Sequence, residues 1–197
     1  MAAKKESKPK SARIVTLLGS PRRAGNSAAL AERIAEGAKE AGAEVESFYL
    51  HEMKIAPCNA CEACHRPGSD GCIIQDDMQK IYAALRTADA VVFASPIYWF
   101  TVSAQMKAAM DRCYALISPE GHAMRGKRIG LAFSYGGEDP FDSGCVNAIR
   151  TFQDAFRFIG AEIVGLVYGN GWAEGDIRSN VKVMDEAKDL GRKLAGW

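Results

Sequence analysis

The sequence predicts an α/β fold in which one parallel β-sheet lies between two layers of helices. Short apolar stretches typical of buried strands alternate, from end to end, with amphipathic stretches typical of helices. Most of the strand stretches are apolar on both faces, as expected of a sheet that helices cover on both sides. With 197 residues, 48% of them hydrophobic and 25% charged, the chain is long enough to form one such domain with a core.

Five strands and five helices are expected. The strands are residues 13–19, 44–50, 90–95, 127–134 and 162–168. The second stretch is the most polar, so we expect it at an edge of the sheet. The helices are expected to begin after Asn26 or Ser27, after Asp76 or Asp77, at Ser103, at Asp142 or Ser143, and at Ile177. The third helix is expected to reach about Leu116, the fourth Ile159 and the last Leu194.

This alternation favours the flavodoxin-like arrangement, a three-layer sandwich with strand order 2-1-3-4-5. In such a sheet, ligands bind beyond the carboxyl ends of the strands, where the order reverses between strands 1 and 3. That rule selects three loops, residues 20–27, 96–103 and 134–142. We expect a single domain at 12–197 with a cysteine-rich loop at 51–75, preceded by a disordered basic tail at 1–11.

The charge balance argues against a nucleic-acid partner. Lys and Arg number 25 and Asp and Glu 24, giving a net charge of +1, whereas non-specific binding to phosphate backbones needs a basic surplus. No stretch approaches the roughly eighteen apolar residues of a transmembrane helix. The first ten residues lack the apolar segment of a secretory signal. We therefore expect no nucleic-acid or membrane partner and a cytoplasmic location.

The first of the three loops places hydroxyl and basic residues directly before a helix. Ser20 and Ser27 offer hydroxyl groups, Arg22 a fixed charge, and Gly25 and Asn26 stand at the helix start. Because a helix N-terminus carries free N–H groups and a positive dipole end, this loop predicts a site for one terminal phosphate. It matches neither the Walker A motif, which needs Lys where Asn26 stands, nor G-x-G-x-x-G. An ordinary turn with solvated arginines is the alternative.

The other two loops offer flat apolar side chains and close backbone approach. After the third strand, three consecutive aromatic residues could form a wall for a planar ring, and after the fourth strand two glycines would let the backbone approach a ligand. The candidates are Pro96, Ile97, Tyr98, Trp99, Tyr135, Gly136 and Gly137. Core or subunit-interface residues and a plain turn are the alternatives. Together with a phosphate at the first loop, such a wall predicts flavin mononucleotide (FMN).

Four of the six cysteines lie within fifteen residues of one another: Cys58, Cys61, Cys64 and Cys72. Three thiolates at steps of three in a short loop match the spacing used for [4Fe–4S] ligation. Structural zinc more often uses two separated C-x-x-C pairs. A zinc site, free thiols and an adventitious disulfide remain the alternatives. The other two, Cys113 and Cys145, are expected to be small buried apolar residues.

Several of these segments together resemble the NADPH-dependent FMN reductase family. The resemblance is carried by Gly19-Ser-Pro-Arg, Gly25-Asn-Ser, Pro96-Ile-Tyr and Ser103-Ala-Gln-Met-Lys with Asp111-Arg112. Residues 58–77 resemble the iron–sulfur flavoprotein branch, with a gap of seven residues before Cys72 at the long end of its pattern.

This resemblance implies a flavodoxin-like fold and non-covalent FMN. Its phosphate would be held by Ser20, Arg22, Asn26 and Ser27, and its ring would be bordered by residues 96–99 and 135–137. NADPH or NADH is implied as a possible electron donor. A homodimer or homotetramer is implied as well, with an interface that helps to close the flavin site.

The function predicted from these features is an FMN-dependent oxidoreductase. It would act either as an NAD(P)H:acceptor reductase or as an iron–sulfur flavoprotein passing electrons between a cluster and FMN, with a small molecule or a protein as redox partner. A flavodoxin-like electron carrier or FMN-binding module without turnover is one alternative, and a zinc-stabilised interaction protein is another. No catalytic side chain is assigned, because the flavin ring would be the reactive centre.

Two groups of residues outside these sites have expected surface roles. Lys107, Asp111 and Arg112 are expected to form a solvated or intersubunit face of a helix. Trp172 and Trp197 are candidates for subunit contacts.

Overall fold

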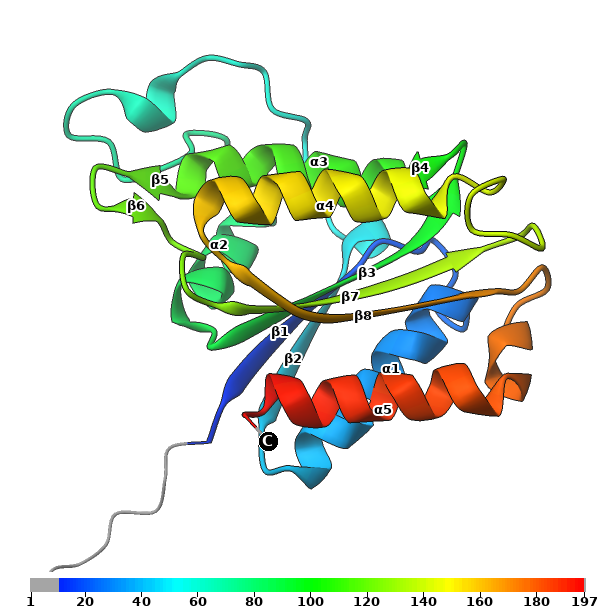
Figure 1. Ribbon diagram of the computed structural model, residues 1–197. Coiled ribbons are helices and arrows are strands. Elements are labelled where there is room, and N and C mark those ends of the chain that lie inside the picture. The colour runs from blue at the N-terminus through cyan, green and yellow to red at the C-terminus, as the bar shows by residue number, and fades with distance from the viewer. Residues whose placement is uncertain (1–10, 197) are drawn as a thin grey trace, which may run out of the picture.

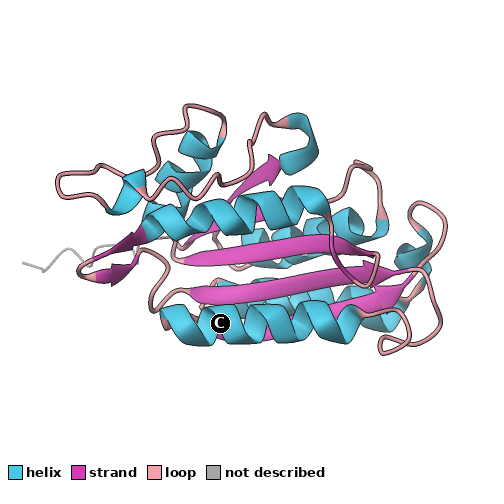
Figure 2. Cartoon of the chain, turned by 90° about the horizontal axis from the view of Figure 1, so that it is seen from above, coloured by secondary structure: helices cyan, strands magenta, loops and turns pink. Residues whose placement is uncertain are grey.

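A five-stranded parallel sheet forms the middle layer of the computed structural model, which describes residues 11–196. Its strands are β1 (Arg13–Leu18), β2 (Glu44–Tyr49), β3 (Ala90–Tyr98), β7 (Arg128–Tyr135) and β8 (Glu162–Asn170). They lie in the order β2-β1-β3-β7-β8 and all run in the same direction. Figure 2 shows the sheet between layers of helices. The predicted order is therefore confirmed, with the polar β2 at an edge.

Helices cover both faces of the sheet (Figure 1). α1 (Asn26–Glu40) and α5 (Val181–Leu194) cover one face, and α2 (Met78–Thr87), α3 (Ala104–Arg112) and α4 (Cys145–Ile159) cover the other. Because successive strand residues point to opposite faces, Val91 and Phe93 pack beneath α2–α4, whereas Ala90 and Val92 pack against α1 and α5. Two separate apolar cores hold the three layers together.

The second predicted ligand loop is largely a hairpin. β3 continues to Tyr98 and turns back through Trp99 and Phe100 into the antiparallel strand β4 (Thr101–Val102). Both turn residues have positive φ, 49° and 66°, as a two-residue type I′ turn requires. The expected loop from Pro96 was therefore wrong in this part, because the aromatic run satisfies its backbone groups by pairing with the chain that follows.

Element boundaries differ from the expectations at several places. α1 is capped by Gly25 rather than by Asn26 or Ser27, and α4 begins at Cys145 rather than at Asp142 or Ser143. The helix expected to reach Leu116 ends at Arg112 and continues as a 3-10 turn, η3 (Cys113–Leu116). The last helix begins with η4 (Asp176–Ser179), after which Asn180 caps α5 through a bond from the Val183 N–H.

Short elements complete the chain. They are η1 (Leu50–Glu52), η2 (Ala63–His65) and the two-stranded ribbon of β5 (Ile117–Ser118) and β6 (Gly121–His122). Of the expected tail at 1–11, residues 1–10 lie outside the described part, and the Ser11 hydroxyl donates a bond to Glu44. Between residues 11 and 196, no helix combines the length and the apolar character needed to cross a bilayer.

Candidate functional site

A pocket of about 390 Å³ opens at the carboxyl ends of the parallel strands. It lies at the point where the strand order reverses between β1 and β3, and its volume is in the range of small-ligand sites. The loops after β1, β7 and β8 and the ends of β3 and β7 contribute to it. Its lining residues are Ser20, Arg22, Gly25, Asn26, Ser27, Pro96, Ile97, Tyr98, Ser134, Tyr135, Gly136, Gly171 and Trp172.

All but two of the twelve predicted cofactor residues line this pocket. Trp99 is 92% exposed at the tip of the β3–β4 hairpin, and Gly137 lies against Ser143 instead. The prediction missed Ser134, Gly171 and Trp172. The last two directly follow the fifth strand, so the rule that ligands bind beyond strand carboxyl ends would have found them if it had been applied to β8.

The loop before α1 has the features of a phosphate site. The Ser20 hydroxyl bonds both the N–H and the carbonyl of Arg22 at 3.0 Å, which shapes the turn. The Ser27 hydroxyl is buried in the first turn and bonds to none of residues 11–196. The first turn of α1 holds no acidic residue, and the exposed Arg22 guanidinium makes no ion pair within the described chain. An anionic group at this helix end would satisfy both side chains.

Asn26 has a different role from the predicted phosphate contact of its side chain. Its Nδ2 donates to the carbonyls of Gly171 and Ala173 at 3.0 and 2.9 Å, and its Oδ1 accepts from the Ile177 N–H at 3.1 Å. The side chain thus fastens the loop after β8 to the start of α1. Toward a phosphate, Asn26 offers only its backbone N–H.

The other side of the pocket provides flat surfaces. Pro96, Ile97 and Tyr98 come from the end of β3, and the exposed Trp172 lies across from them on the loop after β8. A Cβ on Gly136 would lie 3.0 Å from the Trp172 ring, so glycine lets the two loops approach closely. Burial raises the pKa of Tyr135, which keeps its phenol neutral. The pocket therefore joins an anion-binding end to a wall suited to a planar ring.

The four clustered cysteines line a second pocket, together with Arg112 and Tyr114. Cys58 is exposed, and Cys61, Cys64 and Cys72 are half-buried. The loop that carries them bends through Ala60 and Glu62, both with φ of 54°. All six cysteines are free thiols. Among residues 11–196, no three His, Cys, Asp or Glu side chains are placed to hold one metal ion. The thiols therefore border a hollow rather than a closed single-ion site.

The remaining two cysteines are buried in the core on the α2–α4 side, as expected. Burial raises the pKa of both Cys113 and Cys145 to about 12. These thiols therefore stay protonated and serve as packing groups.

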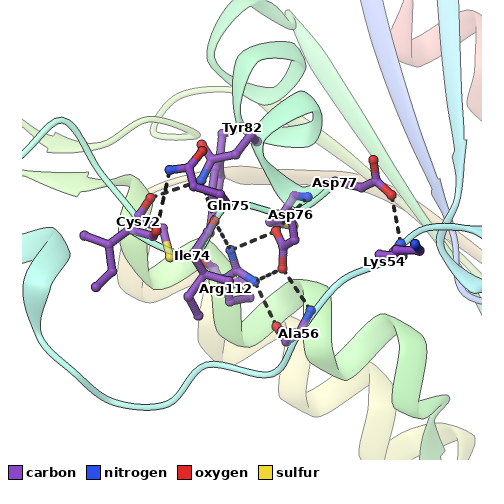
Figure 3. A network of polar contacts seen from close by, with 12 residues as sticks. Lys54, Ala56, Cys72, Ile74, Gln75, Asp76, Asp77, Tyr82 and Arg112 are labelled. Carbon is purple, nitrogen blue, oxygen red and sulfur yellow. Dashed lines mark hydrogen bonds and ion pairs between the residues drawn. The ribbon is translucent and has the colours of Figure 1, made fainter.

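Arg112 is fully buried, so its predicted place on a solvated helix face was wrong. It forms an ion pair with Asp76, Nη1 to Oδ2 at 2.6 Å, at the end of the cysteine loop (Figure 3). The same Nη1 donates to the Ala56 carbonyl at 2.8 Å, where the loop begins. The Asp76 carboxylate also accepts from the Ala56 N–H at 2.9 Å. We call Arg112, Asp76 and Ala56 the clasp, because they join the two ends of the loop.

The clasp keeps the Asp76 carboxylate and the Arg112 guanidinium ionised. Burial alone would raise the pKa of Asp76, but the Arg112 guanidinium and the N–H groups of Ala56 and Met78 hold it below its usual range. Burial likewise acts to lower the pKa of Arg112, but the hydrogen bond to Asp76 and weaker interactions with neighbouring groups together outweigh burial and raise this pKa above its usual range. Lys107 and Asp111 form an exposed ion pair at 2.7 Å, which agrees with the expected solvated or intersubunit face for these two residues.

The two pockets lie at opposite ends of α3. The hydroxyl of Ser103, the N-cap residue of this helix, donates to the Gly19 carbonyl at 2.7 Å, beside the phosphate loop. Arg112, the last residue of α3, lines the cysteine pocket. The nine residues of α3 rise by 1.5 Å each, so the helix that lies between the two pockets is about 14 Å long.

Comparison with known proteins agrees with this geometry. The family model described as NADPH-dependent FMN reductase matches residues 12–167. An iron–sulfur flavoprotein of Methanosarcina thermophila is 35% identical over 153 residues, covering 78% of this chain and 77% of the relative. The iron–sulfur flavoprotein MJ1083 of Methanocaldococcus jannaschii is 30% identical, covering 93% of this chain and 95% of its own.

Solved structures show the same fold. The Trp repressor binding protein of Bacillus subtilis superposes with a TM-score of 0.67 at 28% identity, over 90% of this chain and 98% of that one. A flavodoxin from the domain Archaea superposes with a TM-score of 0.56 at 18% identity, over 93% and 96% of the two chains. The family match spans most of the described residues and every residue that lines the two pockets except Gly171 and Trp172, and the chain accordingly belongs to the NADPH-dependent FMN reductase family.

Proposed function

We propose that this protein is an FMN-dependent oxidoreductase of the iron–sulfur flavoprotein type. FMN would occupy the pocket at the strand ends, and a [4Fe–4S] cluster would be held by Cys58, Cys61, Cys64 and Cys72. The observation that carries the proposal is the presence of two pockets, one with an anion cradle and one lined by four thiols, at the two ends of α3.

The residues present fit a flavin phosphate. A buried hydroxyl without a partner is costly, and the Ser27 hydroxyl would gain one from a phosphate oxygen. Gly25 is needed here because a Cβ would lie 2.9 Å from the Ser20 hydroxyl. Arg22 would supply the positive charge. When bound, FMN supplies hydride exchange with a nicotinamide and single-electron exchange with a cluster.

The cysteine set fits a cluster better than a single zinc ion. Four thiolates about one zinc would each lie about 2.3 Å from it, and the thiols here are not gathered that closely. A four-iron cluster is larger, so its thiolate ligands stand further apart. When bound, the cluster supplies one-electron transfer. The iron–sulfur flavoproteins that this chain resembles support this choice.

The proposal is tested by NADH and NADPH oxidation with a quinone or dye acceptor, using protein purified without oxygen. We expect FMN-dependent turnover by the wild type. Replacing Cys72 with Ser should remove iron and leave FMN bound, whereas Cys145→Ala, which changes a thiol outside the pocket, should keep both. A protein that binds FMN but oxidises neither NADH nor NADPH would favour an electron carrier. Stoichiometric zinc in place of iron would favour an interaction protein.

A further inference from the structure

We propose that Arg112 donates a hydrogen bond from its Nε–H to a sulfur atom of the cluster and thereby raises the reduction potential of the cluster. This inference rests on the proposed function. Its starting point is that Nε of Arg112 is a buried donor with no partner among residues 11–196. The Arg112 side chain is fully buried, so water does not satisfy the group. Burying a donor without a partner destabilises a fold, and more so when the donor is charged.

The other donors of the guanidinium are all occupied (Figure 3). Nη1 bonds the Ala56 carbonyl and Asp76, and Nη2 bonds Asp76 at 3.1 Å and the Ile74 carbonyl at 3.4 Å. The Tyr82 ring lies 5.9 Å from the guanidinium carbon, and its hydroxyl donates to the Arg112 carbonyl at 2.9 Å. These bonds occupy both Nη groups, and within residues 11–196 they leave Nε–H without a partner.

The free donor belongs to a residue that lines the cysteine pocket. Arg112 shares this lining with all four clustered cysteines. A cluster ligated by four thiolates is an anion with soft sulfur acceptors, and a charged N–H is suited to such an acceptor. Asp76 balances the charge of Arg112, so its effect on the cluster would come from this directed bond more than from net charge.

Hydrogen bonds to cluster sulfurs raise the reduction potential, because they stabilise the more negative, reduced form. Losing the Nε–H should therefore make the cluster harder to reduce. Lysine at position 112 can keep the positive charge and the pairing with Asp76, but it has no Nε–H. Arg112→Lys thus separates the bond to sulfur from the ion pair of the clasp.

The test is a redox titration of the protein purified without oxygen, followed by visible absorption and by electron paramagnetic resonance of the reduced cluster. In Arg112→Lys we expect unchanged iron and FMN content, and a cluster potential lowered by about 59 mV, a tenfold change for one electron. The FMN potential serves as the internal reference and should not move. The matched control is Asp76→Asn, which weakens the clasp and leaves the Arg112 charge unbalanced but keeps the Nε–H, and so should not lower the cluster potential.

A second measurement uses the wild type and does not depend on the folding of a variant. Arginine labelled with ¹⁵N in the guanidinium should give a nitrogen hyperfine coupling to the reduced cluster. An unchanged cluster potential in Arg112→Lys, or no arginine coupling in the wild type, would overturn the inference and leave the proposed function standing. Wild-type protein that takes up no iron would overturn both.

Discussion

The hydroxyl of Ser27 is the residue-scale feature that most directly links sequence to ligand. Because it is buried without a partner, Ser27→Ala should leave the thermal stability of the flavin-free protein equal or slightly higher. FMN should bind about tenfold or more weakly, since a hydrogen bond to a charged group contributes about 1.5–3 kcal/mol. Flavin fluorescence titration measures both affinities. Ser143→Ala is the matched control, because the Ser143 hydroxyl is also buried and unpaired but lies outside the pocket. Equal losses in the two variants would contradict the phosphate assignment.

Trp99 holds a backbone conformation that its side chain disfavours. Its φ is 49°, the residue is 92% exposed, and Asn147 Nδ2 donates a hydrogen bond to the Phe100 carbonyl in the same turn. Because asparagine tolerates this conformation, Trp99→Asn should stabilise the fold by about 1 kcal/mol and raise Tm by about 2–4 °C. Phe158→Asn, which removes a similarly exposed aromatic from a helix, should give no such gain. A lower Tm for Trp99→Asn would show that the ring contributes to packing.

His122 makes stability depend on pH. Its Nδ1 accepts from the Met124 N–H, so Nε2–H of the neutral ring donates to the Cys113 carbonyl, both at 3.1 Å. Burial lowers the pKa of His122, although the Cys113 carbonyl acts in the opposite direction. The unfolded chain therefore binds a proton at higher pH than the folded one. The stabilisation by His122 is present above about pH 6.5, the ordinary pKa of histidine, and is lost as the pH falls below it.

Urea unfolding at pH 7.5 and pH 5.5 checks this dependence. His122→Gln should have a lower free energy of unfolding than the wild type at pH 7.5. The difference in free energy of unfolding between the two proteins should be smaller at pH 5.5. A difference that stays constant between the two pH values would contradict the assignment of a neutral, half-buried imidazole.

At the scale of elements, α1 and α5 pack by direct backbone contact. A Cβ on Gly37 would lie 2.0 Å from the Lys188 carbonyl, and one on Gly191 would lie 2.0 Å from the Ile34 carbonyl. Alanine normally stabilises a helix interior relative to glycine. Here Gly37→Ala should instead destabilise the protein by about 1–3 kcal/mol, because the helices must move apart. Lys39→Ala, on an exposed position of α1, should change the urea midpoint little. A stabilised Gly37→Ala would contradict this packing.

The main strands and their order could be predicted because each strand is long enough to show its apolar pattern. β5 and β6 could not, since two-residue strands carry no periodicity. The buried position of Arg112 could not either, because its partner Asp76 lies 36 residues earlier and only the folded cysteine loop brings the two together. The Gly37 contact depends on how two helices pack, which neither helical pattern alone reveals.

Most of the candidate site could be predicted because the switch-point rule depends only on strand order. It selects residues 20–27, 96–103 and 134–142, and each of these segments contributes to the lining of the observed pocket. The side-chain role of Asn26 could not be predicted, because its partners follow β8 and are about 145 residues away. Trp99 was chosen for its aromatic ring, and the β3–β4 hairpin turns it away from the pocket lining. The expected homo-oligomer stays a prediction, and Trp197 lies outside the described residues.

At the scale of the whole molecule, the sheet fixes the position of the pocket at the strand ends, and α3 lies between that pocket and the cysteines. Ser103 joins one end of α3 to the loop after β1, and Arg112, as part of the clasp, joins the other end to the cysteine loop. The cysteine loop is therefore fixed to the helix whose N-cap residue contacts the loop of the proposed flavin site. The proposed exchange of electrons between FMN and a cluster requires such an arrangement.

The most direct test of this account is the ultraviolet–visible spectrum of the protein purified without oxygen, with iron, zinc and flavin assayed on the same sample. We predict two flavin bands over a broad iron–sulfur absorption, one FMN and about four irons per chain, and no stoichiometric zinc. A protein that holds no flavin, and takes none up when FMN is added, would contradict the central claim.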